Sequence, residues 1–271
     1  MKFILIVVSL VFMMTQVDSQ TKKLVAGSKY TVTQESKFSN SSKMMGNDIE
    51  ATIISTMIAD VEIKRVKDSV IVVACTIKRV KGKATAMGQD NVFDSDDSAT
   101  MNNPMIGDAL KDLNKAQEYT VVNGKIKATK GNLDANMPSL TKTMDINCAS
   151  IVGTLFLPLE SKNKKEGYKW TNDEVDNDGT QKAISIFTIS KLNVEQEEIT
   201  ANTTLSSKGK SKMMGMEVNQ NLTGTRNSVL NYNSSGLLNT ATQEVTMSGT
   251  AEIMDNSIPI NSKGTITTTV K

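Results

Sequence analysis

Alternation of apolar and polar residues dominates the chain from Tyr168 onward. Successive side chains of a strand point to opposite faces, so a strand that buries one face shows a period of two residues. Clusters of Asn, Asp, Ser and Gly separate the alternating segments, as the turns of an antiparallel sheet require. The segments are residues 183–189, 199–205, 214–222, 228–232, 237–247 and 265–270. This part of the chain is therefore predicted to be a meander of strands, each with one exposed face.

Hairpins are also predicted in the first half of the chain. Residues 61–66 and 70–77 are rich in β-branched side chains and flank a polar turn at Lys67-Asp68-Ser69. The second arm is apolar on both faces, which indicates a central position in its sheet. Asn123-Gly124 lies between alternating residues and predicts a further hairpin.

The middle of the chain changes to helical spacing. Asn103 and Pro104 are suited to the cap and first turn of a helix, and apolar residues follow at helical intervals, so a helix is predicted from Pro104 to about Gln117. A second apolar stripe predicts a helix over residues 139–156. This second helix would place Cys148 on its buried face.

Two short strings occur twice, in the same order. Residues 27–31 (GSKYT) resemble residues 167–171 (GYKWT), and residues 42–46 (SKMMG) recur as residues 211–215. The repetition indicates two related halves. We predict a mainly β (α+β) fold in which two related antiparallel sheet halves, residues 20–160 and 161–271, form one curved or half-barrel sheet with two short helices in the middle of the chain.

Residues 1–19 have the pattern of a secretory signal peptide. Lys2 precedes an apolar run over residues 3–14, and Ser19 is a small residue suited to the cleavage site. The run is shorter than the roughly 20 residues that span a bilayer. We expect an exported protein that is soluble in a periplasm or outside the cell, with no transmembrane segment in the mature chain.

Composition excludes several classes of function. The chain has no histidine, which removes histidine-based catalytic triads and histidine-ligated metal sites. Its net charge of +2 is too small to predict a nucleic-acid partner. A hydrolase that uses paired carboxylates needs no histidine, but aromatic residues are only 4% of the chain, few for a sugar-binding cleft. We therefore expect no enzyme and no cofactor.

Two acidic segments are candidates for a Ca²⁺ site. Neither has the glycine and terminal glutamate positions of the twelve-residue calcium loop, so solvated turns are the favoured interpretation and no metal is predicted. The first segment contains Asp90, Asp94, Asp96 and Asp97, and the second contains Asp173, Glu174, Asp176 and Asp178.

Methionines and cysteines provide the remaining candidate residues. Methionine adapts to varied apolar ligands, so a methionine-lined cavity is one interpretation, ordinary core packing is another, and a copper(I) site a third. Cys75 and Cys148 form either one disulfide or two buried thiols. The methionines proposed to line an apolar-ligand cavity are Met44, Met45, Met57, Met213, Met214 and Met216.

The layout of several short motifs resembles a family of uncharacterised exported proteins of Bacteroidota, grouped as a domain of unknown function. The motifs are the strand at 70–76, Phe93-Asp94-Ser95, Asn123-Gly124-Lys125-Ile126, Leu157-Pro158-Leu159 before Gly167-Tyr168-Lys169-Trp170, and Tyr232-Asn233-Ser234-Ser235-Gly236-Leu237. The resemblance covers nearly all of the mature chain and implies no activity. The two-half layout also resembles the open half-barrels of lipoprotein carriers and lipid-binding envelope proteins.

Three hypotheses for function follow. The first is a non-enzymatic envelope protein that binds a lipid or another apolar small molecule between the sheet and the helices. The second is a structural or protein-interaction module with a filled core, and the third is a carboxylate-based hydrolase. An unfilled cavity between sheet and helices would favour the first, and a close-packed interior would favour the second.

Overall fold

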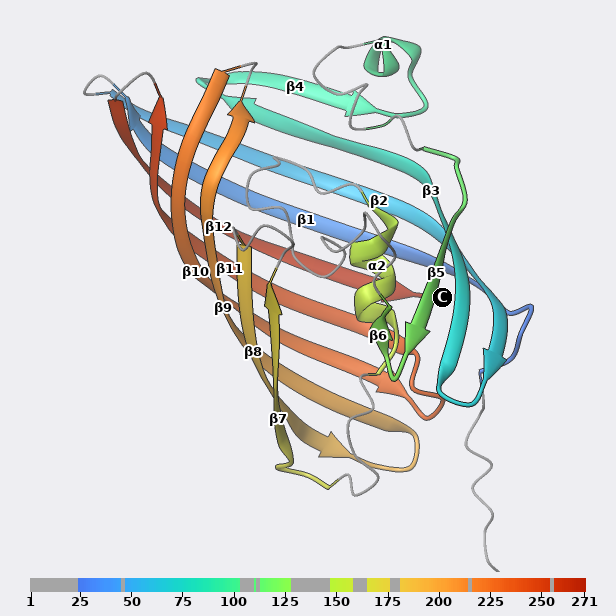
Figure 1. Cartoon of the computed structure of the whole chain (residues 1–271). Helices are drawn as coiled ribbons and strands as arrows, with labels where there is room; N and C mark the ends of the chain where they lie inside the picture. The colour runs from blue at the N-terminus through green and yellow to red at the C-terminus, as the bar shows by residue number, and fades with distance from the viewer. Residues whose placement is uncertain are drawn as a thin grey trace, which may run out of the picture.

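A single curved sheet accounts for most of the described chain. The computed structural model describes residues 24–44, 47–102, 110, 113–127, 147–157, 165–175, 181–213, 216–253 and 256–271. Within these residues, twelve strands form one antiparallel sheet, accompanied by two short helices. Figure 1 shows that the sheet is strongly curved and that one helix, α2, lies inside the curve. The predicted fold class is confirmed.

The elements have the following bounds in chain order. They are β1 (Lys29–Met44), β2 (Asn47–Lys67), β3 (Val70–Ala86), β4 (Gln89–Asp94), α1 (Ser98–Met101), β5 (Gln117–Val122), β6 (Lys125–Ile126), α2 (Cys148–Leu155), β7 (Lys169–Val175), β8 (Gln181–Leu192), β9 (Gln196–Met213), β10 (Met216–Asn233), β11 (Leu238–Ile253) and β12 (Asn256–Val270).

The first and last strands of the chain, β1 and β12, are neighbours in the middle of the sheet. The order is β6-β5-β3-β2-β1-β12-β11-β10-β9-β8-β7, with β4 paired to β3 beside this path. Strands β1 and β12 pair antiparallel, so the early and late strands join in one sheet. The outermost strands of the path are β6 and β7. The division of the chain into two halves stays a prediction.

Several strands are longer than the sequence pattern predicted. Residues 214–222 and 228–232 were expected to be separate strands, whereas β10 runs through both from Met216 to Asn233. The sequence predicted two strands because β10 carries Gly224, Arg226 and Ser228 at inward positions, where the alternation pattern requires apolar side chains. Tertiary pairing on both sides of β10 extends the strand regardless of this local composition.

Both predicted helices were wrong in extent. Of the predicted helix at 104–117, residues 103–109, 111 and 112 lie outside the described residues, and residues 113–116 are not helical. Asn114 has a φ of 60°, in the left-handed region, and β5 begins at Gln117. A short helix that was not predicted, α1, precedes this segment and is capped by the Asp97 side chain.

Helix α2 begins later than predicted because Asn147 is its N-cap. Asn147 has extended backbone angles, and its Oδ1 accepts a hydrogen bond from the Ser150 amide at 2.7 Å. A continuous helix over residues 139–156 is therefore excluded, because the backbone of Asn147 is not helical. Residues 139–146 lie outside the described residues. Cys148 is buried on α2, as predicted.

The main core lies between α2 and the inner face of the sheet. Ile151, Val152 and Leu155 of α2 are almost fully buried against side chains from the sheet. The C-terminal end of α2 is held at the β10–β11 turn, where the Leu157 amide donates to the Gly236 carbonyl at 2.9 Å. Tyr232 of β10 also donates from its hydroxyl to the Thr154 carbonyl at 3.0 Å. These contacts fix α2 over one end of the curved sheet.

A second, smaller apolar cluster lies further along the same face. It contains Leu205, Leu222 and Met247, with Phe38 packed against it. Glycine makes this packing feasible, because a Cβ at Gly264 would collide with the Phe38 ring of the paired strand. The inner face therefore has two apolar regions, and the residues between them form the candidate site.

The first pair of repeated strings, residues 27–31 and 167–171, begins with similar turns. Gly27 and Gly167 both have positive φ, of 88° and 81°, and each precedes a strand. Their amides donate to the carbonyls of Ile63 at 2.7 Å and Ile189 at 2.8 Å, respectively. The two turns thus share one hydrogen-bond pattern, and duplication stays the prediction that this pattern supports.

Candidate functional site

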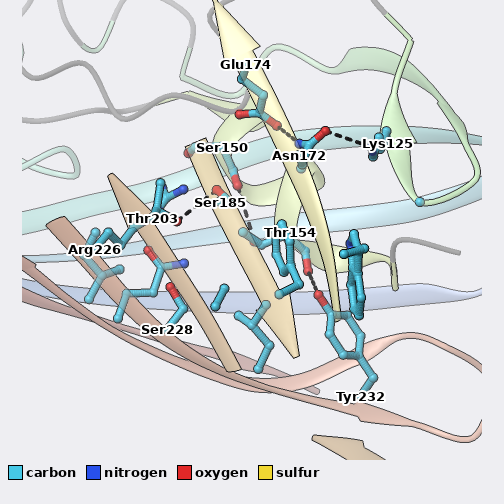
Figure 2. Close-up of a pocket in the computed structure, with 18 of the residues that line it drawn as sticks. Lys125, Ser150, Thr154, Asn172, Glu174, Ser185, Thr203, Arg226, Ser228 and Tyr232 are labelled. Atoms are coloured by element: carbon cyan, nitrogen blue, oxygen red, sulfur yellow. Dashed lines mark hydrogen bonds between the residues drawn. The ribbon is translucent and has the colours of Figure 1, made fainter. Parts of the chain in front are cut away.

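A pocket of about 140 Å³ lies between α2, the β5–β6 turn and the inner face of the sheet. Figure 2 shows its lining side chains, which come from α2, from β6 and from strands of the sheet that include β7 to β10. Both polar and apolar side chains line it. The pocket is partly open, so it is accessible from outside the core.

Helix α2 presents its least bulky face to this pocket. Ser150, Gly153 and Thr154 line it, at the i, i+3 and i+4 spacing that shares one side of a helix. Gly153 is in the interior of the helix, where glycine costs roughly 0.5–1 kcal/mol relative to alanine. Its missing side chain leaves space that a larger residue would occupy.

A belt of polar side chains crosses the floor of the pocket. Ser185 of β8 and Thr203 of β9 are directly paired and share a hydrogen bond of 2.9 Å between their hydroxyls. Ser228 of β10 and Gln243 of β11 are also paired, and both are buried. The belt separates the main core from the smaller apolar cluster. It gives an otherwise apolar face several hydrogen-bonding groups.

Arg226 is the cation of this belt. It shares the inward phase of Leu222, Leu230 and Tyr232 on β10, and it lines the pocket (Figure 2). Within the described residues its guanidinium forms no hydrogen bond and no ion pair, and its electrostatic partner is Glu174. Burial lowers the pKa of Arg226, and the charge of Glu174 opposes that change. An arginine nevertheless keeps its charge in proteins.

Glu174 belongs to a chain of polar contacts that links the two outermost strands. Lys125 of β6 donates to Asn172 Oδ1 of β7 at 2.8 Å, and Asn172 Nδ2 donates to Glu174 Oε1 at 2.7 Å (Figure 2). Burial raises the pKa of Glu174, and the charge of Arg226 is the largest effect opposing it. The pocket therefore lies where the two sheet edges come within side-chain contact of each other.

Stacked aromatic rings form one wall. Trp170 lies between Tyr168 and Phe187, with ring centroids separated by 5.8 Å and 5.1 Å. Trp170 is only 9% exposed, and its indole Nε1 is the buried side-chain nitrogen or oxygen that lacks a hydrogen-bond partner among the described residues. An orphaned N–H of this kind normally costs about 1–3 kcal/mol. Trp170 also lines the pocket.

The first acidic segment forms ion pairs and caps. Asp90 pairs with Lys83 at 2.7 Å, and Arg79 pairs with Asp94 at 2.6 Å and with Asp96 at 3.0 Å. The Arg79 contact lowers the pKa of Asp94. No group of three acidic or cysteine side chains in the described chain could hold a metal ion.

The second acidic segment is divided between the two faces of β7. Asp173 is exposed, whereas Glu174 lines the pocket. Asp176 and Asp178 lie outside the described residues. Glu174 therefore lies on a strand and lines the pocket, whereas the sequence favoured a solvated turn for this segment.

Of the six candidate methionines, Met57 alone has a described side chain. It is 5% exposed and belongs to the main core. Met45 and Met214 lie outside the described residues, as do the side chains of Met44, Met213 and Met216. A methionine-lined cavity therefore stays a prediction.

The two cysteines, distant in sequence, meet in the core. Cys75 of β3 and Cys148 of α2 are both buried thiols in this structure. A side-chain hydrogen bond with Cys148, aided by burial, raises the pKa of Cys75. Whether the pair becomes a disulfide stays a prediction, and the contact makes it geometrically accessible.

Sequence reasoning missed Arg226 as a site residue. The available signal was its phase: counting by two from Leu222 leads through Arg226 to Leu230 and Tyr232, all of which face inward. A charged residue in such a series has to meet a partner or a pocket. Its electrostatic interaction with Glu174 of β7 could not be predicted from the local pattern.

A second hollow, of about 740 Å³, lies over β1, β2 and β3. Charged side chains of both signs line it, including Lys64 and Glu62, which form an ion pair of 2.9 Å. Its charges are largely exposed, so it lacks the burial that distinguishes the pocket under α2.

Comparisons with known proteins add little to this geometry. No protein-family model matches the chain. No curated protein matches it either. Among solved structures, the chain is similar to Pseudomonas aeruginosa OccK7 (OpdD), with a TM-score of 0.28 and 7% identity over 90% of this chain and 99% of that one. For Pseudomonas putida OprB at low pH, the TM-score is 0.18 and the identity 4%, over 89% of this chain and 92% of that one. Similarity at these TM-scores supports no conclusion about the fold or the function of this chain.

Membrane-spanning helices were sought in the same described residues. None of the helices there has the length and apolar character needed to cross a bilayer.

Proposed function

We propose that the protein is a non-enzymatic exported protein that binds one apolar or amphipathic ligand in the pocket between α2 and the inner face of the sheet. The observation that carries the proposal is the pocket itself, which stays unfilled beside a close-packed core. A filled interior would have favoured an interaction module instead.

The dimensions of the pocket limit what it can enclose. A cavity of roughly 150 Å³ accommodates a benzene-sized molecule. At about 140 Å³, the pocket has room for a small ligand or for one end of a longer one. Because the pocket is partly open, the remainder of a lipid would extend out of it.

The lining also supports binding over catalysis. Hydrolysis by paired carboxylates requires two acids about 5–10 Å apart. Glu174 is the single carboxylate among the described residues that line the pocket. Phe187, Leu230 and Ile266 give it an apolar portion suited to a hydrocarbon chain.

Export is part of the proposal. The apolar run at residues 3–14 after Lys2 supports it. So does the likeness in layout to exported β-rich proteins of Bacteroidota, together with the open sheet that lipid-binding half-barrels also have. The place of action would be a periplasm or the outside of the cell.

Trp170 provides a direct binding assay, because it is the one tryptophan of the chain and lines the pocket. We expect octan-1-ol and octanoate each to change its emission in a saturable manner. Every methylene that enters the apolar part should tighten binding about fourfold, from roughly 0.8 kcal/mol per buried CH₂. Hexyl and octyl ligands would show this dependence.

The matched control is Gly153→Leu, which fills the pocket with a residue that favours helix. Its circular dichroism and urea unfolding should resemble those of the wild type, while both ligands lose saturable binding. Failure of both ligands to bind the wild type, or equal binding to Gly153→Leu, would contradict the proposed function.

A further inference from the structure

We propose that the ligand has an anionic end, a carboxylate or a phosphate, which pairs with Arg226 at the floor of the pocket. This inference rests on the proposed function and specifies the chemistry of the ligand.

The partly buried position of Arg226 is the first step. Removing a guanidinium from water is costly unless the charge is paired and its N–H groups are hydrogen-bonded. Arginine has five such donors, and none of them has a protein acceptor among the described residues. Arg226 shares the inward face of β10 with Leu222 and Leu230, and it lines the pocket. A ligand oxygen would supply the acceptor that the protein does not provide for these donors.

Glu174 is a weak counter-charge for Arg226. One of its oxygens, Oε1, already accepts a hydrogen bond from Asn172. It makes no ion pair with Arg226, and burial raises its pKa. The two groups influence each other through space without contact. Space for a competing anion therefore remains beside the guanidinium.

The charges around the pocket favour an anion. Among the described residues that line it, the ionisable ones are two cations, Arg226 and Lys125, and one carboxylate, Glu174. A carboxylate or phosphate adds negative charge to a site with an excess of positive charge, and it accepts charge-assisted hydrogen bonds, which are about twice as strong as neutral ones. A cationic ligand would face repulsion from both cations.

Trp170 supports the same conclusion independently. Its Nε1–H is buried without a partner in the wall of the same pocket. A ligand acceptor that reached this donor would remove the cost of leaving it unpaired. The adjacent Phe187 and Leu230 would contact the apolar part of the ligand.

The test compares ligands with one chain and different ends, using Trp170 emission. We expect octanoate and octyl phosphate to bind more tightly than octan-1-ol, by roughly tenfold to a hundredfold, and octylamine to bind most weakly. Arg226→Gln should remove the advantage of the anions and leave octan-1-ol unchanged. Arg226→Lys should restore part of it.

Glu174→Gln is expected to change anion affinity in the opposite direction to Arg226→Gln. It removes the competing carboxylate but keeps the shape and the contact with Asn172, so we expect anion affinity to rise about threefold or more. This arm also remains informative if Arg226→Gln folds poorly. Equal binding of octanoate and octan-1-ol, or no response to either variant, would overturn the inference while the proposed function stands.

Acetate and inorganic phosphate separate the sources of the anion. Weaker binding of these tail-less ions than of their octyl counterparts would support a lipid-like ligand. Equal affinity with and without the tail would support the pairing with Arg226 but contradict the amphipathic ligand of the proposed function. Absence of all binding would count against both.

Discussion

Protein that has passed through an oxidising compartment is expected to carry a disulfide between Cys75 and Cys148, and its reduction is expected to lower the free energy of unfolding by roughly 4 kcal/mol. The two side chains are in contact in the core, and the bond would attach α2 to β3. The magnitude follows from the long loop that the bond would close in the unfolded chain. Exported proteins retain such bonds, whereas cytosolic ones rarely do.

The disulfide is expected to form before folding is complete. The contact with Cys148 and burial both raise the pKa of Cys75, so the folded reduced protein has little of the reactive thiolate. Oxidation is therefore expected before α2 packs on the sheet. Protein made in a reducing cytoplasm should keep both thiols unmodified by alkylating reagents until it is unfolded.

Intact mass with and without reductant measures the bond, and urea unfolding under both conditions measures its effect. The double variant Cys75→Ala/Cys148→Ala is the control, and its unfolding should not respond to reductant. If reduction changes neither the mass of the exported protein nor its unfolding midpoint, the cysteines are simply buried thiols.

Replacement of Trp170 by alanine is expected to destabilise the protein by about 3–5 kcal/mol. The ring is almost fully buried and stacks between Tyr168 and Phe187, so its removal leaves a cavity and breaks two ring contacts. The stack also holds β7 on the end of the sheet. We expect the effect to include loss of ligand binding.

Trp170→Phe is the matched variant. It keeps a ring in the stack and removes the unpartnered indole N–H, whose cost offsets part of the lost volume, so we expect stability within about 1 kcal/mol of the wild type. Urea unfolding followed by circular dichroism suits both variants, because they lack the tryptophan fluorophore. Equal destabilisation by alanine and phenylalanine would show that the stack contributes little.

The sheet was predictable because its signal is local. Alternation and turn residues reveal strands such as β3 and β11, and Asn123-Gly124 reveals the β5–β6 hairpin. Strand continuity was less accessible, since Arg226 and Ser228 interrupt the apolar series within β10. The start of α2 was predicted wrongly because Asn147 acts as an N-cap within an apolar stripe that predicts one continuous helix.

The candidate site was largely inaccessible to sequence reasoning, since curvature of the sheet assembles it. Lys125 and Asn172 come from opposite edges of the sheet, yet they form a hydrogen bond. Glu174 could be named only as part of an acidic segment, because nothing local distinguishes its inward side chain from the outward Asp173. Long-range packing, absent from any local window, decides which polar residues face the pocket.

Native mass spectrometry of the protein purified from the envelope of its own host tests the central claim most directly. The account predicts that the wild type carries additional mass, released by solvent extraction as an amphipathic anion, and that Gly153→Leu purified in parallel carries none. Identical masses for the two proteins, each equal to the bare chain, would contradict it.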